Sequence, residues 1–319
     1  TQRPDAPFLA AYGEYSIGVK TLDIINYQQI DIVKIDPLLP QPKNLPRYDR
    51  PLTLEIWYPA DSNSKGKTTL DVYLRDGKTK VALHGRAVRD AEPIKTAQKF
   101  PLVLVSHGYP GNRFLMSHLA ENIASKGYVV VSIDHTDSTY RTQAAFSSTL
   151  VNRTLDQLFT LDQIDLMSND NSSFLYNFVD PQNTALIGYS MGAYGALISA
   201  GASVTQQAVD LPWGAPHKTL AIHQNLSDTS SSTDPRIKTV IAFAPWGMNH
   251  GVWDQTTLMG ISIPLFFVAG SVDDVSGYET GIRNIWKNVT HADRALLTFD
   301  NANHGAGAPM PAPKESYVY

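Results

Sequence analysis

The chain of 319 residues contains no cysteine. Disulfide bonds, thiolate metal ligands and a cysteine nucleophile are therefore excluded together. The absence does not assign a compartment, because a chain without cysteine is stable in oxidising and in reducing surroundings alike.

Long runs of a single character are also missing. The formal net charge is −4 and no long basic run occurs, which argues against nucleic acid as a partner, because phosphate binding needs clustered lysine and arginine. No apolar stretch approaches the roughly 20 residues of a membrane-spanning helix. The chain starts at Thr1 rather than at methionine, and we expect an exported protein, secreted or periplasmic. No metal and no cofactor is expected, and the oligomeric state is left open.

Apolar segments of two kinds alternate along the chain. Continuous apolar runs are typical of buried strands, and apolar residues at helical spacing indicate helices. The predicted strands are residues 52–58, 102–105, 129–134, 184–188, 240–244, 264–268 and 294–299. The predicted helices are residues 115–124, 155–167, 193–202 and 279–288. This alternation predicts an α/β protein with a mainly parallel central sheet and helices on both faces, in one domain spanning residues 1–319.

Three segments lack this regular pattern. The first 50 residues contain only short β-like pieces, and residues 61–97 are polar and irregular. Residues 204–236 are polar, carry proline and serine clusters and show little periodicity. Because a long irregular stretch inside a compact domain is usually functional or disordered, we interpret residues 204–236 as an inserted lid.

The segment Gly188-Tyr189-Ser190-Met191-Gly192 matches the pattern G-x-S-x-G. In this pattern a strand turns sharply into a helix and holds the serine in a strained conformation, so larger flanking side chains would collide. A β run precedes the segment and a helical stretch follows it. The context therefore favours a nucleophile elbow with Ser190 as the nucleophile.

A nucleophile elbow requires an acid and a histidine later in the chain, in that order. His304 lies in a loop of small residues just after the last predicted strand, and we expect it to be the base. The other later histidines are His217, His223, His250 and His291. Asp273 follows the strand at residues 264–268, where site residues of α/β sheets gather, and we prefer it as the acid to the neighbouring Asp274.

Two backbone N–H groups should stabilise the oxyanion. One is that of Met191, at the start of a helix. The other should lie in the loop after an earlier strand, where Tyr109 is the candidate because Pro110 cannot donate. His107 is expected to shape this loop beside the substrate site. The tryptophans Trp213, Trp246 and Trp253 are candidates to line an apolar acyl or aromatic pocket.

Further motifs resemble platelet-activating-factor acetylhydrolases and their bacterial, dienelactone-hydrolase-like relatives of the α/β-hydrolase superfamily. They are Ser106-His107-Gly108, residues 119–130, Asp134-His135-Thr136-Asp137-Ser138, Ala244-Pro245-Trp246 and Pro264-Leu265-Phe266-Phe267. The resemblance runs from about Leu52 to His304. In the plasma-type acetylhydrolases the triad aspartate immediately precedes the Pro-Trp pair, where this chain has Ala244, so the acid must lie elsewhere. Dienelactone hydrolases proper use a cysteine nucleophile, which this chain lacks.

A second resemblance is to polyester-hydrolysing cutinases. Gly108-Tyr109, Ser190-Met191-Gly192 and Asp273 are similar to their oxyanion loop, elbow and acid. Those enzymes have an open groove without a long lid, whereas this chain has the insertion at residues 204–236.

Together these features predict a serine carboxylic-ester hydrolase of the α/β-hydrolase fold. The expected partners are small-molecule or polymeric ester substrates: short-acyl esters, with polyesters and acetyl phospholipids as further candidates. An acyltransferase or a peptidase would use the same triad, and a non-catalytic binding protein of this fold is a third alternative. Product analysis with and without an added alcohol or amine separates the first two from a hydrolase.

Overall fold

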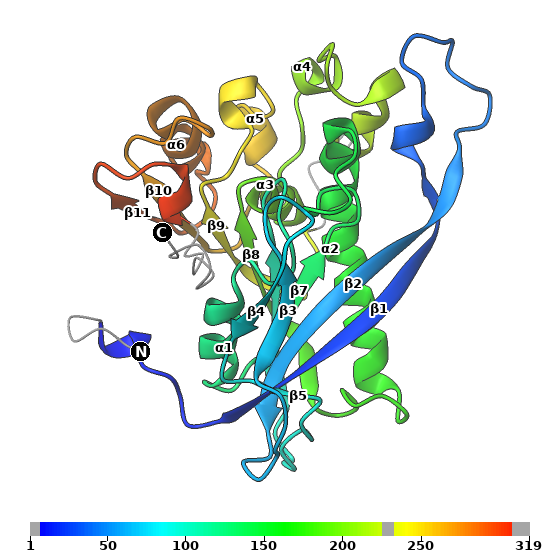
Figure 1. Cartoon of the computed structure of the whole chain (residues 1–319). Coiled ribbons are helices and arrows are strands. Elements are labelled where there is room, and N and C mark those ends of the chain that lie inside the picture. The colour runs from blue at the N-terminus through cyan, green and yellow to red at the C-terminus, as the bar shows by residue number, and fades with distance from the viewer. Residues whose placement is uncertain (1–6, 225–232, 308–319) are drawn as a thin grey trace.

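A computed structural model describes residues 7–224 and 233–307, and its centre is a nine-stranded sheet (Figure 1). The strand order is β11-β10-β9-β8-β6-β7-β2-β1-β5. Strand β2 pairs antiparallel with β1 and β7, and the other neighbours pair parallel. The strands are β1 (Ser16–Ile30), β2 (Arg47–Ala60), β5 (Val88–Arg89), β6 (Phe100–Ser106), β7 (Val129–Asp134), β8 (Val179–Tyr189), β9 (Ile237–Phe243), β10 (Leu265–Gly270) and β11 (Arg294–Phe299).

Helices cover both faces of the sheet. The helices are α1 (Ser117–Ala124), α2 (Phe146–Asn169), α3 (Met191–Ser199), α4 (Gln206–Val209), α5 (Gln255–Leu258), the π-helix η5 (Tyr278–Ile282) and α6 (Arg283–Asn288). Side chains of β6 alternate between the two faces: Leu102 and Leu104 pack in a hydrophobic cluster with α2 and α3, while Val103 and Val105 pack in a second cluster with α1. The predicted fold class is therefore confirmed.

The N-terminal part of the chain contains more β structure than predicted. Strand β1 has 15 residues and pairs with β2 from Ser16 opposite Ala60 to Ile30 opposite Arg47. Figure 1 shows the two strands as one long twisted ribbon. Polar cross-strand pairs support it, such as the 2.9 Å hydrogen bond from Thr21 Oγ1 to Glu55 Oε2. Because these positions are polar, the strand shows no clear apolar alternation in the sequence.

The prediction that residues 61–97 are irregular is wrong as well. This segment contains a hairpin of β3 (Thr69–Tyr73) and β4 (Lys80–His84), followed by β5. The hairpin is largely exposed and buries only Leu70 and Val81. Two short strands with one buried residue each give too weak an alternation to be recognised in the sequence.

Residues 204–236 are only partly described, because residues 225–232 lie outside the described ranges. The described part contains α4 and the kinked 3₁₀ segment η3 (Pro216–His223). Val204, Val209 and Leu220 are buried in the core, so this part packs firmly on the domain. Its role as a lid stays a prediction.

The described helices include none that is long and apolar enough to cross a membrane.

Candidate active site

Ser190 stands alone between the end of β8 at Tyr189 and the start of α3 at Met191. Its φ of 53° and ψ of −112° place it in the strained region that L-residues rarely adopt. The turn requires glycine on both sides. A Cβ atom on Gly188 would lie 2.4 Å from the Gly192 carbonyl carbon, and one on Gly192 would lie 2.0 Å from the Ser106 carbonyl oxygen. The G-x-S-x-G spacing therefore follows from close backbone contact.

The structure brings Ser190, His304 and Asp273 together in one hydrogen-bonded chain. His304 Nε2 lies 3.0 Å from Ser190 Oγ, and His304 Nδ1 lies 2.8 Å from Asp273 Oδ2. If the aspartate is ionised, Nδ1–H donates to it, and the free electron pair of Nε2 then accepts the Ser190 hydroxyl proton. The expected acid and base thus stand in the geometry that their roles require.

Asp273 is fixed and kept charged by its surroundings. Its other carboxylate oxygen accepts the backbone N–H groups of Val275 at 2.9 Å and Ser276 at 2.8 Å. Burial alone raises the pKa of this carboxyl, but the hydrogen bond from His304 and the two N–H groups outweigh it and lower the pKa below its ordinary value. The neighbouring Asp274 is exposed.

The two N–H groups expected to bind an oxyanion lie next to Ser190. The Met191 N–H opens helix α3, and a Cβ on Gly108 would lie 3.4 Å from Ser190 Cβ, which places the Gly108–Tyr109 peptide against the nucleophile. Neither N–H has an acceptor among the hydrogen bonds of the described residues. Both donors are thus free to bind a substrate oxygen.

His107 orients the Gly108–Tyr109 peptide. Its ring is buried, with Nε2 accepting the His135 N–H at 3.2 Å and Nδ1 lying 2.7 Å from the Gly108 carbonyl oxygen. The C=O and N–H of a trans peptide point in opposite directions. Holding the carbonyl on the His107 side therefore turns the Tyr109 N–H away from it. His107, at 1% exposed, contacts this loop from the interior of the protein.

The three tryptophans occupy different environments. Trp246 lies beside the nucleophile, with its backbone N–H 3.4 Å from the Ser190 carbonyl oxygen. Trp253 is only 3% exposed and packs against Tyr194, whereas Trp213 is 49% exposed. Trp246, at 8% exposed, and Trp253 both belong to the buried core, and Trp213 alone of the three is exposed; their contact with a substrate stays a prediction.

The remaining late histidines bond elsewhere. His217 contacts the Asp36 carbonyl, His223 the Val151 carbonyl and His291 the Met259 carbonyl, while His250 stacks on Trp246. Within residues 7–224 and 233–307, no group of three or more metal-ligating side chains is arranged to hold an ion.

A second Ser–His–Asp chain lies beneath the site and was missed in the sequence. Ser106 Oγ lies 2.8 Å from His135 Nε2, and His135 Nδ1 lies 2.9 Å from Asp156 Oδ2. Asp156 also receives two hydrogen bonds of 2.7 Å from the guanidinium of Arg50. All four side chains are fully buried. The motifs containing Ser106 and His135 were apparent only through the family resemblance.

Two more charged groups complete this buried network. Asp137 lies 3.2 Å from Arg50, and Arg153 of α2 donates to the His107 carbonyl and to Ser138 Oγ. Burial lowers the pKa of the Arg153 guanidinium to about 10. The network lies directly under the loop that carries Tyr109, and so ties that loop to the sheet and to α2.

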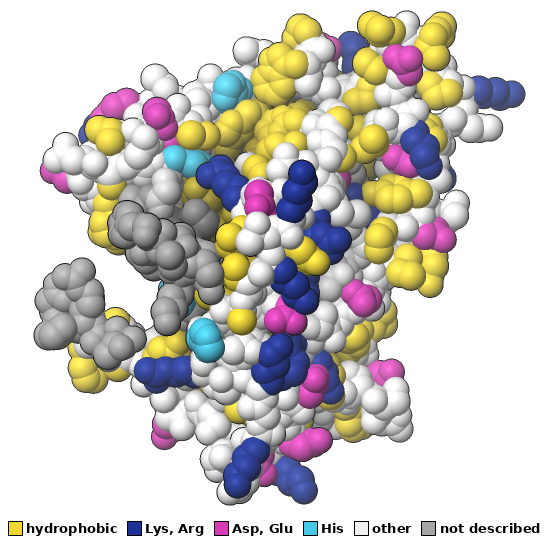
Figure 2. Space-filling model, viewed as in Figure 1, with side chains coloured by type: hydrophobic (Ala, Val, Ile, Leu, Met, Phe, Trp, Pro, Cys, Tyr) yellow, Lys and Arg dark blue, Asp and Glu magenta, His cyan; other side chains and the backbone are white. Residues whose placement is uncertain are grey.

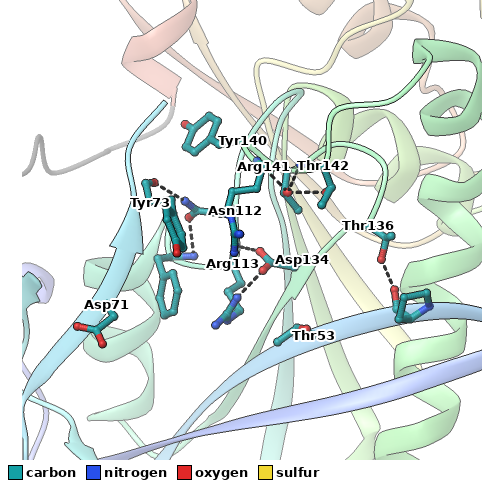
Figure 3. A pocket seen from close by; sticks show the side chains of 13 residues that line it. Thr53, Asp71, Tyr73, Asn112, Arg113, Asp134, Thr136, Tyr140, Arg141 and Thr142 are labelled. Carbon is teal, nitrogen blue, oxygen red and sulfur yellow. Dashed lines mark hydrogen bonds and ion pairs between the residues drawn. The ribbon is translucent and has the colours of Figure 1, made fainter. Parts of the chain in front are cut away.

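A polar pocket of about 360 Å³ lies between the β3–β4 hairpin and the loops after β6 and β7 (Figure 3). Asn112 donates to the Tyr73 carbonyl at 3.3 Å. Figure 3 shows Arg113 directed at Asp134, and Arg113 also binds Glu55 at 2.9 Å. The central charged groups of this pocket are already paired with each other. Its residues therefore hold the hairpin against the loop that follows Tyr109.

A serine between strand and helix, followed by an acid and a histidine after later strands of a mainly parallel sheet, defines the α/β-hydrolase fold. A solved structure agrees with this assignment: the ferulic acid esterase from Streptomyces cinnamoneus, at a TM-score of 0.59 and 18% identity, covers 93% of this chain and 77% of its own. At this identity the likeness shows the fold alone.

Comparisons of the sequence show which proteins this chain resembles. Residues 86–223 match the family model described as PET hydrolase-like. Cutinase 2 of Thermobifida cellulosilytica is 26% identical over 210 residues, which are 64% of this chain and 60% of that protein. Cutinase cut1 of Thermobifida fusca is also 26% identical, over 64% of this chain and 49% of its own length. The platelet-activating factor acetylhydrolase of Cavia porcellus is 31% identical over 96 residues, 29% of this chain and 22% of that protein.

The sequence is thus similar to PET hydrolase-like proteins and cutinases, with the family model matching less than half of the chain, and the fold is that of the α/β-hydrolases. The chain spans only about half to three fifths of the two cutinases, at 49% and 60% of their lengths.

Proposed function

We propose that this protein is a serine carboxylic-ester hydrolase that acts on short-acyl esters through an acyl-enzyme, with polyesters and acetyl phospholipids as its candidate natural substrates. The observation that carries the proposal is the continuous hydrogen-bonded chain from Ser190 through His304 to Asp273, next to two N–H groups that have no acceptor within the part of the chain that the structure describes. The names of the similar proteins, two cutinases and an acetylhydrolase, support an ester as the substrate.

The geometry supplies a complete route for acyl transfer. His304 Nε2 takes the Ser190 proton as Oγ attacks the ester carbonyl, and the N–H groups of Met191 and Tyr109 bind the oxyanion. The imidazolium, held by ionised Asp273, then gives the proton to the leaving alcohol oxygen. Water attacks the acyl-enzyme by the same route, releasing the acid and restoring the Ser190 hydroxyl.

The first test is hydrolysis of p-nitrophenyl acetate and butyrate by the wild type and by Ser190→Ala. Turnover by the wild type that is lost in a correctly folded Ser190→Ala protein is the expected result. A wild type that turns over neither ester, or a variant that keeps the activity, would overturn the proposal. Adding an alcohol or an amine then shows by product analysis whether water is the preferred acceptor.

Polyester film and acetyl phospholipid vesicles form the second step. Release of soluble acid from the film, or of acetate from the vesicles, identifies which substrate class the wild type accepts.

Asp274→Asn is the matched control for Asp273→Asn, because it changes an exposed carboxyl one residue away. We expect full activity in Asp274→Asn and a large loss of activity in Asp273→Asn.

A further inference from the structure

Helix α2 buries two polar side chains, Arg153 and Gln157, where it packs against α3. Figure 2 shows charged side chains dispersed over the visible surface of the molecule, which is their usual place. Arg153 and Gln157 are each only 1% exposed, so neither is placed to touch a substrate. Removing such groups from water costs free energy unless they are hydrogen-bonded. Their role therefore follows from the atoms that they bind inside the protein.

The two side chains bind the two segments that carry the expected oxyanion donors. Arg153 Nη1 donates to the carbonyl oxygen of His107, one peptide before the peptide that supplies the Tyr109 N–H. Gln157 Nε2 donates at 3.0 Å to the carbonyl oxygen of Gly192, in the first turn of α3, whose first N–H is the other donor. Arg153 and Gln157 lie four positions apart, which places them on one face of α2 about one turn from each other. A single helix thus holds both halves of the oxyanion site.

Helices α2 and α3 approach each other closely at the same two side chains. A Cβ atom on Gly195 of α3 would lie 2.6 Å from Arg153 Cγ and 2.8 Å from Gln157 Nε2. Gln157 Oε1 also accepts the Ser199 hydroxyl at 2.9 Å, so this one side chain binds α3 near both of its ends. Hydrogen bonds fix distance and direction, whereas apolar contacts are non-directional. These polar contacts therefore fix the position of α3 along α2.

The loop that carries Tyr109 and the start of α3 also touch each other. A Cβ atom on Gly192 would lie 2.8 Å from the His107 carbonyl oxygen. An oxyanion is stabilised when both N–H groups lie about 2.7–3.1 Å from the same oxygen. A misplacement of about 1 Å can lower a rate about a hundredfold. A small shift of the loop against α3 would therefore be enough to impair the site.

We propose that Arg153 and Gln157 are positioning residues that together set the separation of the Tyr109 and Met191 N–H groups. Arg153 holds the loop, Gln157 holds the start of α3, and α2 is their common support. The inference rests on the proposed function, because it assigns the two side chains a role in the same acyl transfer. The oxyanion exists only in the tetrahedral stages of that reaction. Loss of the correct separation should therefore lower kcat and leave KM nearly unchanged.

The first test replaces Gln157 with methionine, which is also unbranched and has no hydrogen-bond donor. Gln157→Met should lower kcat for p-nitrophenyl butyrate about 10–100-fold and change KM less than about twofold. The matched control is Ser199→Ala, which removes the hydrogen bond to Gln157 Oε1 and leaves the one to the Gly192 carbonyl in place. Its kcat should stay within about twofold of the wild type. Equal losses of kcat in the two variants would show that Gln157 only packs the helices together, and would overturn the inference.

A transition-state analogue gives a readout that a loss of stability would not move. With 1,1,1-trifluorohexan-2-one, Ser190 Oγ should bond to the carbonyl carbon and pass its proton to His304 Nε2. The electron pair of the broken C=O π bond then makes the carbonyl oxygen an oxyanion at the two N–H groups. The inhibition constant of the ketone should rise in Gln157→Met by the same factor as kcat/KM falls. An inhibition constant equal to that of the wild type, beside a lowered kcat/KM, would contradict the positioning role.

Arg153→Lys tests the other contact. The planar guanidinium of Arg153 reaches Ser138 Oγ at 2.7 Å as well as the loop carbonyl, and an ammonium group lacks this fork. Lysine keeps a positive charge near Asp137 and Asp156, which favours folding of the variant. We expect kcat to fall about tenfold at an unchanged KM, with a matching rise in the inhibition constant of the ketone. Denaturant unfolding verifies that each variant is folded. Wild-type kcat and inhibition constant in a folded Gln157→Met or Arg153→Lys protein would overturn the inference.

Binding of the ketone separates failure of this inference from failure of the proposed function. Binding by the wild type that Gln157→Met weakens, without turnover of any ester, would reject the esterase and keep the positioning role. Ser190-dependent turnover of esters with no effect of Gln157→Met or Arg153→Lys would reject the positioning role alone. A folded wild type that neither turns over esters nor binds the ketone would reject both.

Discussion

The molecule contains two Ser–His–Asp chains with nearly the same hydrogen-bond lengths. In the candidate active site the distances are 3.0 Å from Ser190 to His304 and 2.8 Å from His304 to Asp273. In the buried chain they are 2.8 Å from Ser106 to His135 and 2.9 Å from His135 to Asp156. In both, Nδ1 of the imidazole faces the carboxylate and Nε2 faces the hydroxyl. Hydrogen-bond geometry alone therefore does not distinguish a catalytic triad from a structural one.

Access and backbone shape distinguish the two chains. The His304 side chain is 15% exposed, whereas that of His135 is fully buried. Ser190 lies in a strained turn, whereas Ser106 is the last residue of β6 and pairs with β7 and β8 on either side. Ser190 keeps 7% of its surface exposed, whereas Ser106 keeps none.

The charges around the two imidazoles also differ. Burial, together with the positive charges of Arg153 and Arg50, lowers the pKa of His135 well below its ordinary value. A proton taken up by His135 would be confined with two guanidinium groups in a dry interior. The lesson of the comparison is that a serine hydrolase needs an imidazole that can be charged during the reaction, and only His304 is exposed enough to allow this.

The largest expected contrast is between the two serines. Ser190→Ala should lower kcat about a million-fold, the loss measured when a triad serine is removed. Ser106→Ala should leave kcat within about twofold and instead lower the free energy of unfolding by about 1–3 kcal/mol, because His135 Nε2 loses its partner in a dry interior. Ester kinetics and denaturant unfolding measure the two effects separately. A large loss of kcat in a stably folded Ser106→Ala protein would contradict this division of roles.

Replacing the two aspartates should separate catalysis from stability in the same way. Asp273→Asn should lower kcat about ten-thousand-fold, because the amide favours the wrong tautomer of His304. Asp156→Asn should lower the free energy of unfolding by about 3–5 kcal/mol, because it breaks a fully buried ion pair and leaves Arg50 partly uncompensated. Unfolding curves and single-turnover kinetics on both variants test the pair. An Asp156→Asn protein as stable as the wild type would show that the Arg50 pair is dispensable.

Gly192 lies between the two Ser–His–Asp hydrogen-bond networks, two residues after Ser190 and against the Ser106 carbonyl. Its replacement should therefore affect both networks. The Cβ atom of Gly192→Ala would lie 2.0 Å from the Ser106 carbonyl oxygen, so β6 and α3 must move apart. We expect a loss of about 1–3 kcal/mol in unfolding free energy, as for other overpacked sites, together with lower kcat. Gly305→Ala is the control, because a Cβ there would meet no atom of the described residues within 4 Å. Equal effects of the two substitutions would contradict the close approach.

Much of the candidate site could be predicted because its signals are local and ordered. The elbow needs glycine at fixed spacing around the serine, and the acid and histidine must follow in a known order after apolar strands. These constraints alone led to Ser190, Asp273 and His304, the three residues that the structure brings together. The parallel strands from β6 onward each contain an apolar run, and β7 and β11 have the predicted bounds.

The buried network was missed because it buries polar side chains, whereas the prediction expects buried positions to be apolar. Helix α2 begins at Phe146, although the predicted helix began at residue 155. Its early turns bury Asn152, Arg153 and Asp156, which a hydrophobic pattern assigns to the solvent side. Only partners that are distant in the sequence make such burial favourable: Arg50, for example, reaches Asp156 from β2. No spacing within α2 contains this information.

The smallest expected effect is a pH dependence of stability that arises from the buried imidazoles. Burial lowers the pKa of His107, His135 and His223 in the folded protein. Below the ordinary histidine pKa of about 6.5, the unfolded chain therefore binds protons that the folded protein does not bind. Stability is therefore complete above about pH 6.5 and falls as the pH decreases below it, by about 1.4 kcal/mol per pH unit for each such histidine.

Asp273 contributes in a lower window. The pKa of this carboxyl is lowered in the folded state, so its contribution is present above its ordinary pKa and is lost only at more acidic pH. Between about pH 5 and 6.5 the slope of unfolding free energy against pH should therefore come from the histidines. His135→Gln should reduce that slope by about one proton, because glutamine can accept the Ser106 hydroxyl but does not titrate. The exposed His291, changed to glutamine, should leave the slope unchanged. If both variants keep the wild-type slope in denaturant titrations, His135 is protonated in the folded protein, and the distinction between the two Ser–His–Asp chains would then have to rest on access alone.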